Sequence, residues 1–187
     1  MRETASVVAL VLIVVGAAGS PAGLAADADQ KKVRAQEIAH ELLSLRSALA
    51  RTFISADTEV TEQTFQRVCA PVGARAKELA AQEGIVIRQT AIKNRNPAHA
   101  ATLSEVAVLE GFLKDPAKQD QWDQIEMDGK SYQRYMRRID VEEPCLRCHG
   151  PKTSRPEFLA KKYPEDKAFD FGVGDLRGAI VVMVPTE

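Results

Sequence analysis

The chain has 187 residues with 25 basic and 26 acidic side chains, so its formal net charge is −1. A near-neutral chain of this length is expected to form one domain, and its charge balance argues against a nucleic-acid or anionic-membrane surface as its target. Because the three cysteines are an odd number, at least one thiol has no disulfide partner within the chain.

Residues 1–26 are predicted to form a secretory signal peptide. Arg2 supplies a positive charge, an apolar run follows it, and small residues follow the run. This order is typical of a secretory signal, and the run is shorter than the roughly 20 residues that a membrane span needs. Cleavage between Ala25 and Ala28 would leave residues 27–187 as one periplasmic or secreted domain, with no membrane insertion. An uncleaved anchor is the alternative.

The domain is predicted to begin with two helices. Apolar residues recur at steps of three and four over 38–53, which predicts a long N-terminal helix with one buried stripe. His40 lies off that stripe and is expected to face solvent. A second stripe covers 65–79, where Pro71 should kink the helix or restart it. Cys69 lies beside this stripe and is expected to point inward, or nearly so.

The rest of the chain predicts strands and short helices. Strands are expected where β-branched residues concentrate, and an Asp-Gly pair at 128–129 predicts a hairpin turn. A capping box at 102–105 predicts the start of a helix. In that helix Val106, Leu109 and Leu113 should face the core. This order defines an α+β fold with a small antiparallel sheet flanked by helices. The expected strands are 85–90, 122–127, 131–139 and 176–184, and the short helix is 155–163.

The segment Cys145-Leu146-Arg147-Cys148-His149 carries the clearest chemical signal. C-x-x-C-H is the attachment motif of c-type haem. Its two thiols can each add to one vinyl group of a porphyrin, and the adjacent histidine then becomes the proximal ligand of the iron. The sequence therefore predicts one covalently attached haem c. A zinc or thioredoxin-like role is the alternative, but the chain lacks a second ligand pair at metal spacing.

The motif leaves the second axial ligand open. If Cys145 and Cys148 hold haem, Cys69 remains as an unpaired thiol, and such a residue is as often a small apolar core residue as a ligand. An empty axial position is a further alternative. The other side chains that could bind iron are His40, His99, Met127, Met136 and Met183.

A family resemblance is carried by five segments in order: 87–90, 93–97, 145–151, 158–168 and 174–180. Together they resemble the PAS-like c-type haem domain family, whose members are secreted haem proteins and sensor modules, and the resemblance spans roughly 61–185. It implies a PAS-like fold with iron held by the motif histidine and by a cysteine on an upstream helix. The matching residues are His149 and Cys69. Because the family loop often has asparagine where this chain has His99, His99 stays a rival ligand.

Several charged residues lie within these segments. Arg88 and Arg95 are candidates for contacts with haem propionates, because guanidinium groups match carboxylates in geometry. The alternative is a solvated turn or a structural salt bridge. Arg177 is a weaker candidate of the same kind. Asp166 and Asp175 are expected to cap turns.

The predicted function is that of a periplasmic c-type haem protein with His/Cys ligation. A thiolate ligand favours ferric iron, so a low reduction potential is expected. The protein would act in electron transfer or redox signalling through a redox or signalling protein partner whose identity the sequence does not give. A haem-based sensor of diatomic gases is the alternative. We find no nucleophile–base pair and no paired carboxylates, so no enzymatic role is expected.

Overall fold

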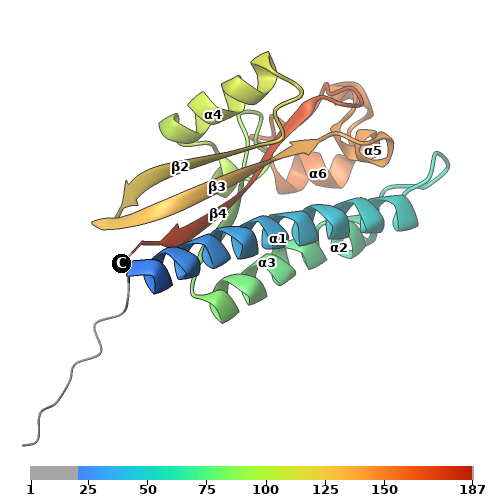
Figure 1. The fold of residues 1–187 in the computed structure, drawn as a ribbon. Helices are drawn as coiled ribbons and strands as arrows, with labels where there is room; N and C mark the ends of the chain where they lie inside the picture. Colours follow the sequence, from blue (N-terminus) through green and yellow to red (C-terminus); the bar gives the residue numbers. More distant parts are fainter. Residues whose placement is uncertain (1–20, 187) are drawn as a thin grey trace, which may run out of the picture.

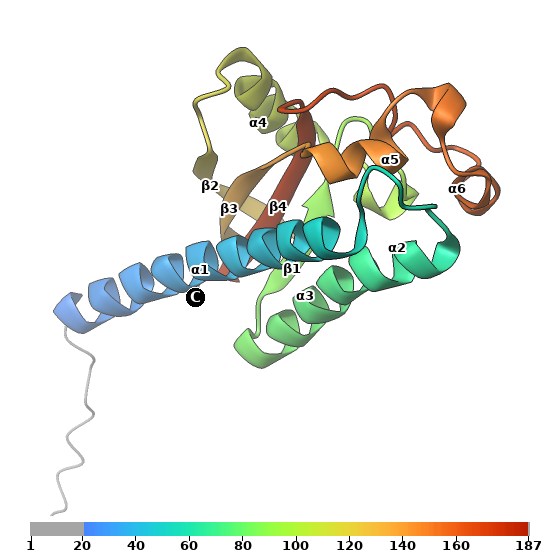
Figure 2. The same ribbon diagram turned by 90° about the vertical axis from the view of Figure 1, so that its right-hand side faces the viewer.

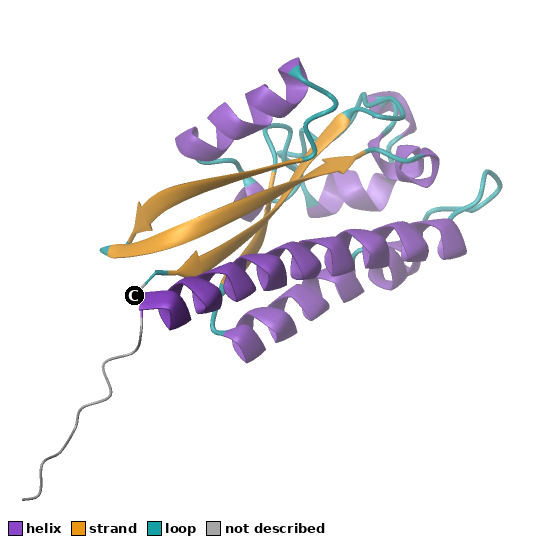
Figure 3. Ribbon diagram, viewed as in Figure 1, coloured by secondary structure: helices purple, strands orange, loops and turns teal. Residues whose placement is uncertain are grey.

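The computed structural model describes residues 21–186, which form a four-stranded sheet with helices on both faces (Figures 1 and 3). All neighbouring strands are antiparallel, and their order is β1-β4-β3-β2. The expected α+β class and the antiparallel sheet are confirmed, whereas the PAS-like description stays a prediction. The strands are β1 (Val86–Thr90), β2 (Asp120–Met127), β3 (Lys130–Asp140) and β4 (Leu176–Pro185).

The helices begin with a long α1, as the apolar spacing predicted. Residues 1–20 of the expected signal peptide lie outside the described part of the chain, and its expected cleavage region falls in the first turns of α1. Among the described helices, none is both long and apolar enough to cross a bilayer. The α-helices are α1 (Pro21–Phe53), α2 (Glu62–Val68), α3 (Ala70–Glu83), α4 (Leu103–Lys114), α5 (Leu146–His149) and α6 (Glu157–Lys162), and the 3-10 turns are η1 (Pro97–His99), η2 (Glu143–Cys145) and η3 (Lys152–Ser154).

Local sequence signals explain where these elements end. Pro71 lies in the first turn of α3, and the chain breaks between α2 and α3 at Cys69, because proline fits the first turn of a helix but not its interior. Gly84 ends α3 with a left-handed φ of 65°. The hairpin turn places Asp128 and Gly129 at φ values of 52° and 72°, the left-handed pair that a tight two-residue hairpin needs.

The two faces of the sheet bury different side chains of β4. Ile180, Val182 and Val184 pack with α1 and α3 in one core, whereas Val181 and Met183 pack with α4 in a second core. This alternation follows from the two-residue period of a strand, and β4 is apolar on both faces because helices cover both. Met183 is therefore a core residue, as its setting in an apolar strand suggested.

The buried face of α4 differs from the prediction at two positions, and Val106, which was expected to face the core, is only half-buried. Leu113 was expected in the core, but 55% of its surface is exposed, and Phe112 is buried instead. The inward stripe begins at Glu105, whose carboxylate accepts a hydrogen bond from the Thr90 hydroxyl at 2.8 Å. The prediction counted only apolar residues as buried and so left out Glu105. The predicted stripe was therefore rotated around the helix relative to the face that actually packs on the sheet. Val108 and Leu109 complete the actual stripe.

The haem motif on α5 lies beside the C-terminal end of α1 (Figure 2). Here η2 follows β3 and contacts α1, and α5 continues from η2. Arg51 of α1 forms an ion pair with Glu142 at 2.9 Å, which holds the start of η2 against the helix. The long N-terminal helix thus connects the core of the domain with the cysteine-containing turn.

Candidate cofactor site

Four of the predicted site residues line one cavity at this end of the molecule. Cys145, Cys148 and His149 come from η2 and α5, and Cys69 comes from the junction of α2 and α3. Segments nearly 80 positions apart in the sequence are therefore brought to one place by the packing of α1 and α2 near α5. The remaining lining residues are Arg46, Ala50, Ile54, Val68, Val72 and Pro144.

The motif thiols are presented by a single helical turn. Cys145 and Cys148 are three positions apart, so they lie on the same side of that turn. Burial is the main cause that raises the pKa of both thiols, to about 11 for Cys148, so both remain protonated near neutral pH. Gly150 lets the chain leave α5, because a Cβ at this position would lie 2.6 Å from the carbonyl oxygen of Leu146.

His149 is held as a neutral imidazole with a defined tautomer. Its Nδ1 lies 2.8 Å from the carbonyl oxygen of Ala168, and only a protonated Nδ1 can donate to that oxygen. Burial, followed by the positive charges of Arg177 and Arg95, lowers the pKa of the imidazole well below its ordinary value. The lone pair therefore resides on Nε2, which is the form of histidine that binds a metal.

Arg95 holds the backbone around His149 in place through hydrogen bonds. Its guanidinium donates to the carbonyl oxygens of Cys148 at 2.6 Å and Ala168 at 3.2 Å, and it is paired with Asp166 at 3.1 Å. The side chain of Asp166 is fully buried and also pairs with Arg155. Asp166 caps a turn by accepting from the Ala168 amide, as expected, but it also anchors two arginines. The network fixes the carbonyl that orients His149.

Cys69 departs from its expected orientation. Cys69 was predicted to point inward beside the stripe that contains Phe65. In the structure Cys69 is exposed and lies at the rim of the cavity. The break between α2 and α3 is the reason, because residues on either side of it no longer share one helical face. Phe65 packs instead near the rings of Phe158 and Tyr163.

Arg88 lies on the opposite face of the sheet. Its guanidinium donates to the carbonyl oxygens of Ala98 and Ala100 and lies 3.5 Å from Glu105, so its donors already have protein partners. Arg88 therefore takes part in a structural salt bridge, and its guanidinium group does not face the cysteines. Arg95 likewise uses its donors for backbone and Asp166.

The rival ligands lie away from His149. His40 is exposed on α1, as expected, and His99 lines an adjoining cavity that contains neither motif cysteine. The methionines Met127, Met136 and Met183 belong to the core on the α4 side of the sheet. Of the side chains first considered, Cys69 alone shares the His149 cavity.

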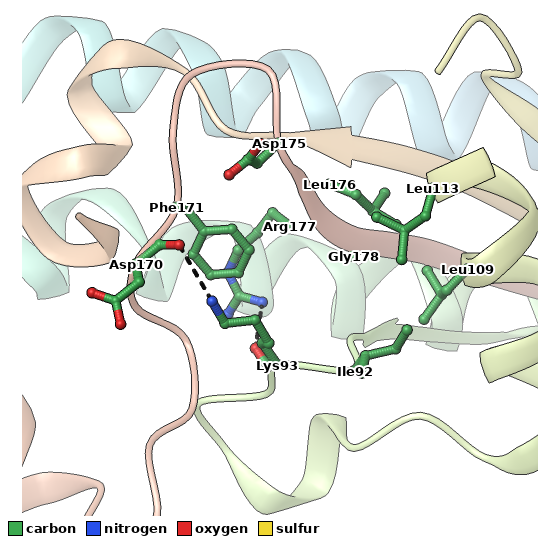
Figure 4. Close-up of a pocket in the computed structure, with 10 residues that line it drawn as sticks. All are labelled: Ile92, Lys93, Leu109, Leu113, Asp170, Phe171, Asp175, Leu176, Arg177 and Gly178. Carbon is green, nitrogen blue, oxygen red and sulfur yellow. Dashed lines mark hydrogen bonds between the residues drawn. The ribbon is translucent and has the colours of Figure 1, made fainter. Parts of the chain in front are cut away.

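A larger cavity, of about 300 Å³, is lined in part by Arg177 and Gly178, which also line the cavity of His99 (Figure 4). It is bordered by Leu109 and Leu113 of α4, by Lys93 and by the ring of Phe171, whose centroid lies 4.2 Å from Lys93 Nζ. It holds neither thiol nor imidazole. The smaller cavity is the candidate cofactor site, because the two motif thiols and the imidazole line it.

The donor set suits a wide cofactor rather than a bare ion. Within residues 21–186, no group of three or more His, Cys, Asp or Glu side chains is arranged to hold a metal ion, which leaves the zinc alternative without a ligand set. The thiols, the imidazole and the apolar walls are side chains that could hold a haem group. The cavity measures about 40 Å³, so a porphyrin fits only once its walls have separated, because small-molecule pockets typically measure ~300–1,000 Å³.

Fold and site together define a small α+β protein with a cysteine–histidine cofactor site. The chain belongs to the Tll0287-like family, whose model matches residues 27–185. A solved structure, the crystal structure of the cyanobacterial heme-protein Tll0287, is similar with a TM-score of 0.70 and 42% sequence identity. The similarity covers 90% of this chain and 98% of that one. A comparison with curated proteins gave no match.

Proposed function

We propose that the protein binds one haem c, attached through Cys145 and Cys148 with His149 as its proximal ligand. The observation that carries this proposal is the position of both thiols and the His149 imidazole along one cavity, with Nδ1 of that ring held 2.8 Å from the Ala168 carbonyl oxygen. The similar cyanobacterial structure is that of a haem protein, which supports the same cofactor class. Bound haem would supply one-electron chemistry at its iron.

Cys69 is our proposed second axial ligand. It lies across the cavity from the motif on a separate helix junction, and its thiol has no disulfide partner. Arg95 and Asp166 would act as positioning residues by holding the Ala168 carbonyl against Nδ1 of His149. An imidazole whose second nitrogen donates to a carbonyl is a stronger donor, and its ring cannot rotate freely.

The protein would serve in electron transfer or redox signalling with a protein partner, in the periplasm or outside the cell, rather than as an enzyme. This assignment is supported by the placement of both motif thiols and the His149 imidazole along one cavity, where they could hold the cofactor. A diatomic gas sensor is the second candidate, and the exposure of Cys69 favours it, because a ligand at the rim can leave more easily than a packed one.

The test is production of the chain with a cytochrome c maturation system. The wild-type band should keep its haem colour through denaturing electrophoresis, and His149→Ala should lose stable holoprotein. His40→Ala is the matched control, since His40 is an exposed histidine on α1, and it should behave as wild type. A colourless wild-type band would refute the proposal. Carbon monoxide binding to the ferrous wild-type form would favour the sensor role over simple electron transfer.

A further inference from the structure

Two arginines beside the site have buried nitrogen atoms without partners. The Nε atoms of Arg46 and Arg177 are inaccessible to solvent and find no hydrogen-bond partner among the described residues. Buried donors are nearly always satisfied in folded proteins, so each unsatisfied one needs an explanation. Leaving a buried donor unpaired costs ~1–3 kcal/mol, and more for a charged group.

Arg46 connects the cysteine cavity with its neighbour. It lies on α1 and lines both the cavity of Cys145, Cys148 and His149 and the adjoining cavity that holds His99 and Arg177. Its guanidinium donates to the side-chain oxygen of Gln89 at 2.7 Å, a neutral acceptor, and it has no carboxylate partner within residues 21–186. The two cavities are thus adjacent, with this guanidinium group between them.

Arg177 enters the second cavity through an irregularity of the sheet. The register of β3 and β4 shifts so that Ile139 faces Gly178 and Asp140 faces Leu176, which leaves Arg177 without a partner in β3. Such bulges redirect a side chain, and they are frequent beside functional sites. Gly178 permits the close approach of β1, because a Cβ there would lie 2.2 Å from the carbonyl oxygen of Thr90.

The charge of Arg177 is not neutralised locally. Its guanidinium donates to the Lys93 carbonyl oxygen at 3.2 Å, which is again a neutral acceptor. Burial, together with the positive charges of Arg46 and Arg95, lowers its pKa to about 9. The neighbouring His99 has its pKa lowered for similar reasons, by burial and then by Arg177, Arg88 and Arg46. The charge of Asp166 opposes the shift at Arg177, but no carboxylate of residues 21–186 lines the second cavity itself.

The position of this charge relative to the thiols is informative. The porphyrin of haem has its vinyl groups on one side and its two propionates on another, so thioether bonds at Cys145 and Cys148 direct the propionates away from α5. Arg46 and Arg177 are the cationic side chains that line the adjoining cavity. Guanidinium groups bind carboxylates through charge-assisted, often bidentate, hydrogen bonds.

We propose that Arg46 and Arg177 form a carboxylate-binding pair that receives the propionates of the covalently attached haem. This inference rests on the proposed function, and it reassigns the contact from Arg88 and Arg95, whose donors are used elsewhere. The pair supplies two half-buried cations whose Nε atoms are buried and unpartnered, and the propionates supply the anionic oxygens that complete their hydrogen bonding. A free carboxylate from solution offers the same chemistry and is the competing source.

The test uses the holoprotein and resonance Raman spectroscopy of the propionate bending modes. Arg46→Gln and Arg177→Gln should each shift these bands, and the reduction potential should fall in both, because a positive charge near the iron favours the ferrous state. Arg177→Lys keeps the positive charge but loses the bidentate geometry of the guanidinium group. The propionate bands of this variant should therefore shift, while its reduction potential should change less than that of Arg177→Gln. Arg137→Gln is the matched control: Arg137 also has a buried unpartnered Nε, but it pairs with Asp120 and lines neither cavity. Its bands should match those of wild type.

The outcomes separate this inference from the proposed function. Absence of covalent haem in the wild-type chain would overturn both. Covalent haem with propionate bands unchanged in Arg46→Gln, Arg177→Gln and Arg177→Lys would overturn the carboxylate-binding pair alone. Titration of the holoprotein with acetate distinguishes the two sources. No saturable binding is expected if propionates occupy the pair, whereas binding that Arg177→Gln abolishes, with unchanged bands, would assign the pair to a free anion and refute the proposal.

Discussion

Arginines on the two sides of the sheet are used differently. On the α4 side, Arg134 is 2% exposed and donates to Asp123 at 2.8 Å and to the Ser104 hydroxyl at 2.9 Å. On the side of the cysteine cavity, Arg46 and Arg177 contact only neutral acceptors, and each has an unpartnered Nε.

Whether an arginine has a complete set of hydrogen-bond partners distinguishes structural from functional arginines in this fold. A buried charge with a complete set of partners stabilises the arrangement that surrounds it, and nothing further is needed to explain it. A buried donor with missing partners is costly, so it persists where something else completes it. By this criterion Arg134 and the Arg95–Asp166 pair are scaffold, whereas Arg46 and Arg177, which line the two adjoining cavities, mark a site.

The largest effect is expected on the side of the proposed haem site. The double variant Cys145→Ala, Cys148→Ala should not attach haem, and its melting temperature should fall strongly because the porphyrin would otherwise fill part of the core. A ligand present at 1,000 times its Kd contributes about 4 kcal/mol, and a tethered haem should contribute at least that. Equal melting curves for the double variant and the wild-type holoprotein would show that the thiol side of the sheet does not depend on a bound cofactor for its stability.

On the scaffold side, Arg134→Met should cost about 3 kcal/mol, because it leaves Asp123 and Ser104 without their buried partner. The variant should nevertheless keep the wild-type visible spectrum and reduction potential. Chemical denaturation and spectroscopy on the same sample check both statements. A changed potential would mean that the two sides of the sheet are not independent.

Asp166→Asn should have a smaller effect on stability and a distinct effect on the iron. It weakens the charged hydrogen bonds to Arg95 and Arg155 and should cost about 2 kcal/mol. If the Ala168 carbonyl then loosens from His149, the imidazole becomes a weaker donor and the potential should rise. Asp175→Asn is the control, because Asp175 is an exposed turn cap that accepts from the Gly172 amide. It should leave the potential unchanged.

Cys69→Ser should have the smallest effect on stability and a clear effect on the spectrum. Because Cys69 is exposed, the unfolding free energy should change by less than about 0.5 kcal/mol. If the thiolate binds iron, the ferric spectrum should become high-spin or show a replacement ligand, and the potential should rise. His99→Ala should stay low-spin. An unchanged spectrum and potential in Cys69→Ser would make the thiol a rim residue without a role at the iron.

Local signals in the sequence were reliable where one short segment decides the outcome. The Thr102–Glu105 capping box opens α4, the Asp-Gly pair forms the hairpin turn, and Gly84 ends α3. The α+β class followed from these signals because they are set by backbone geometry and by contacts within a few residues. The thiol spacing and the neighbouring histidine were readable for the same reason.

Only the tertiary structure decided which side chains complete one another across the chain. Arg46 gave no signal at the sequence level, because an arginine near an apolar stripe of α1 looks like any half-buried cation. Arg88 lies next to Gln89 in β1 yet faces the other side of the sheet, since neighbouring residues of a strand point in opposite directions. Cys69 is exposed because a helix break separates it from the stripe it follows. The sequence by itself determined the chemistry of the groups, and the register of β4 with the packing of α1 determined which of them meet.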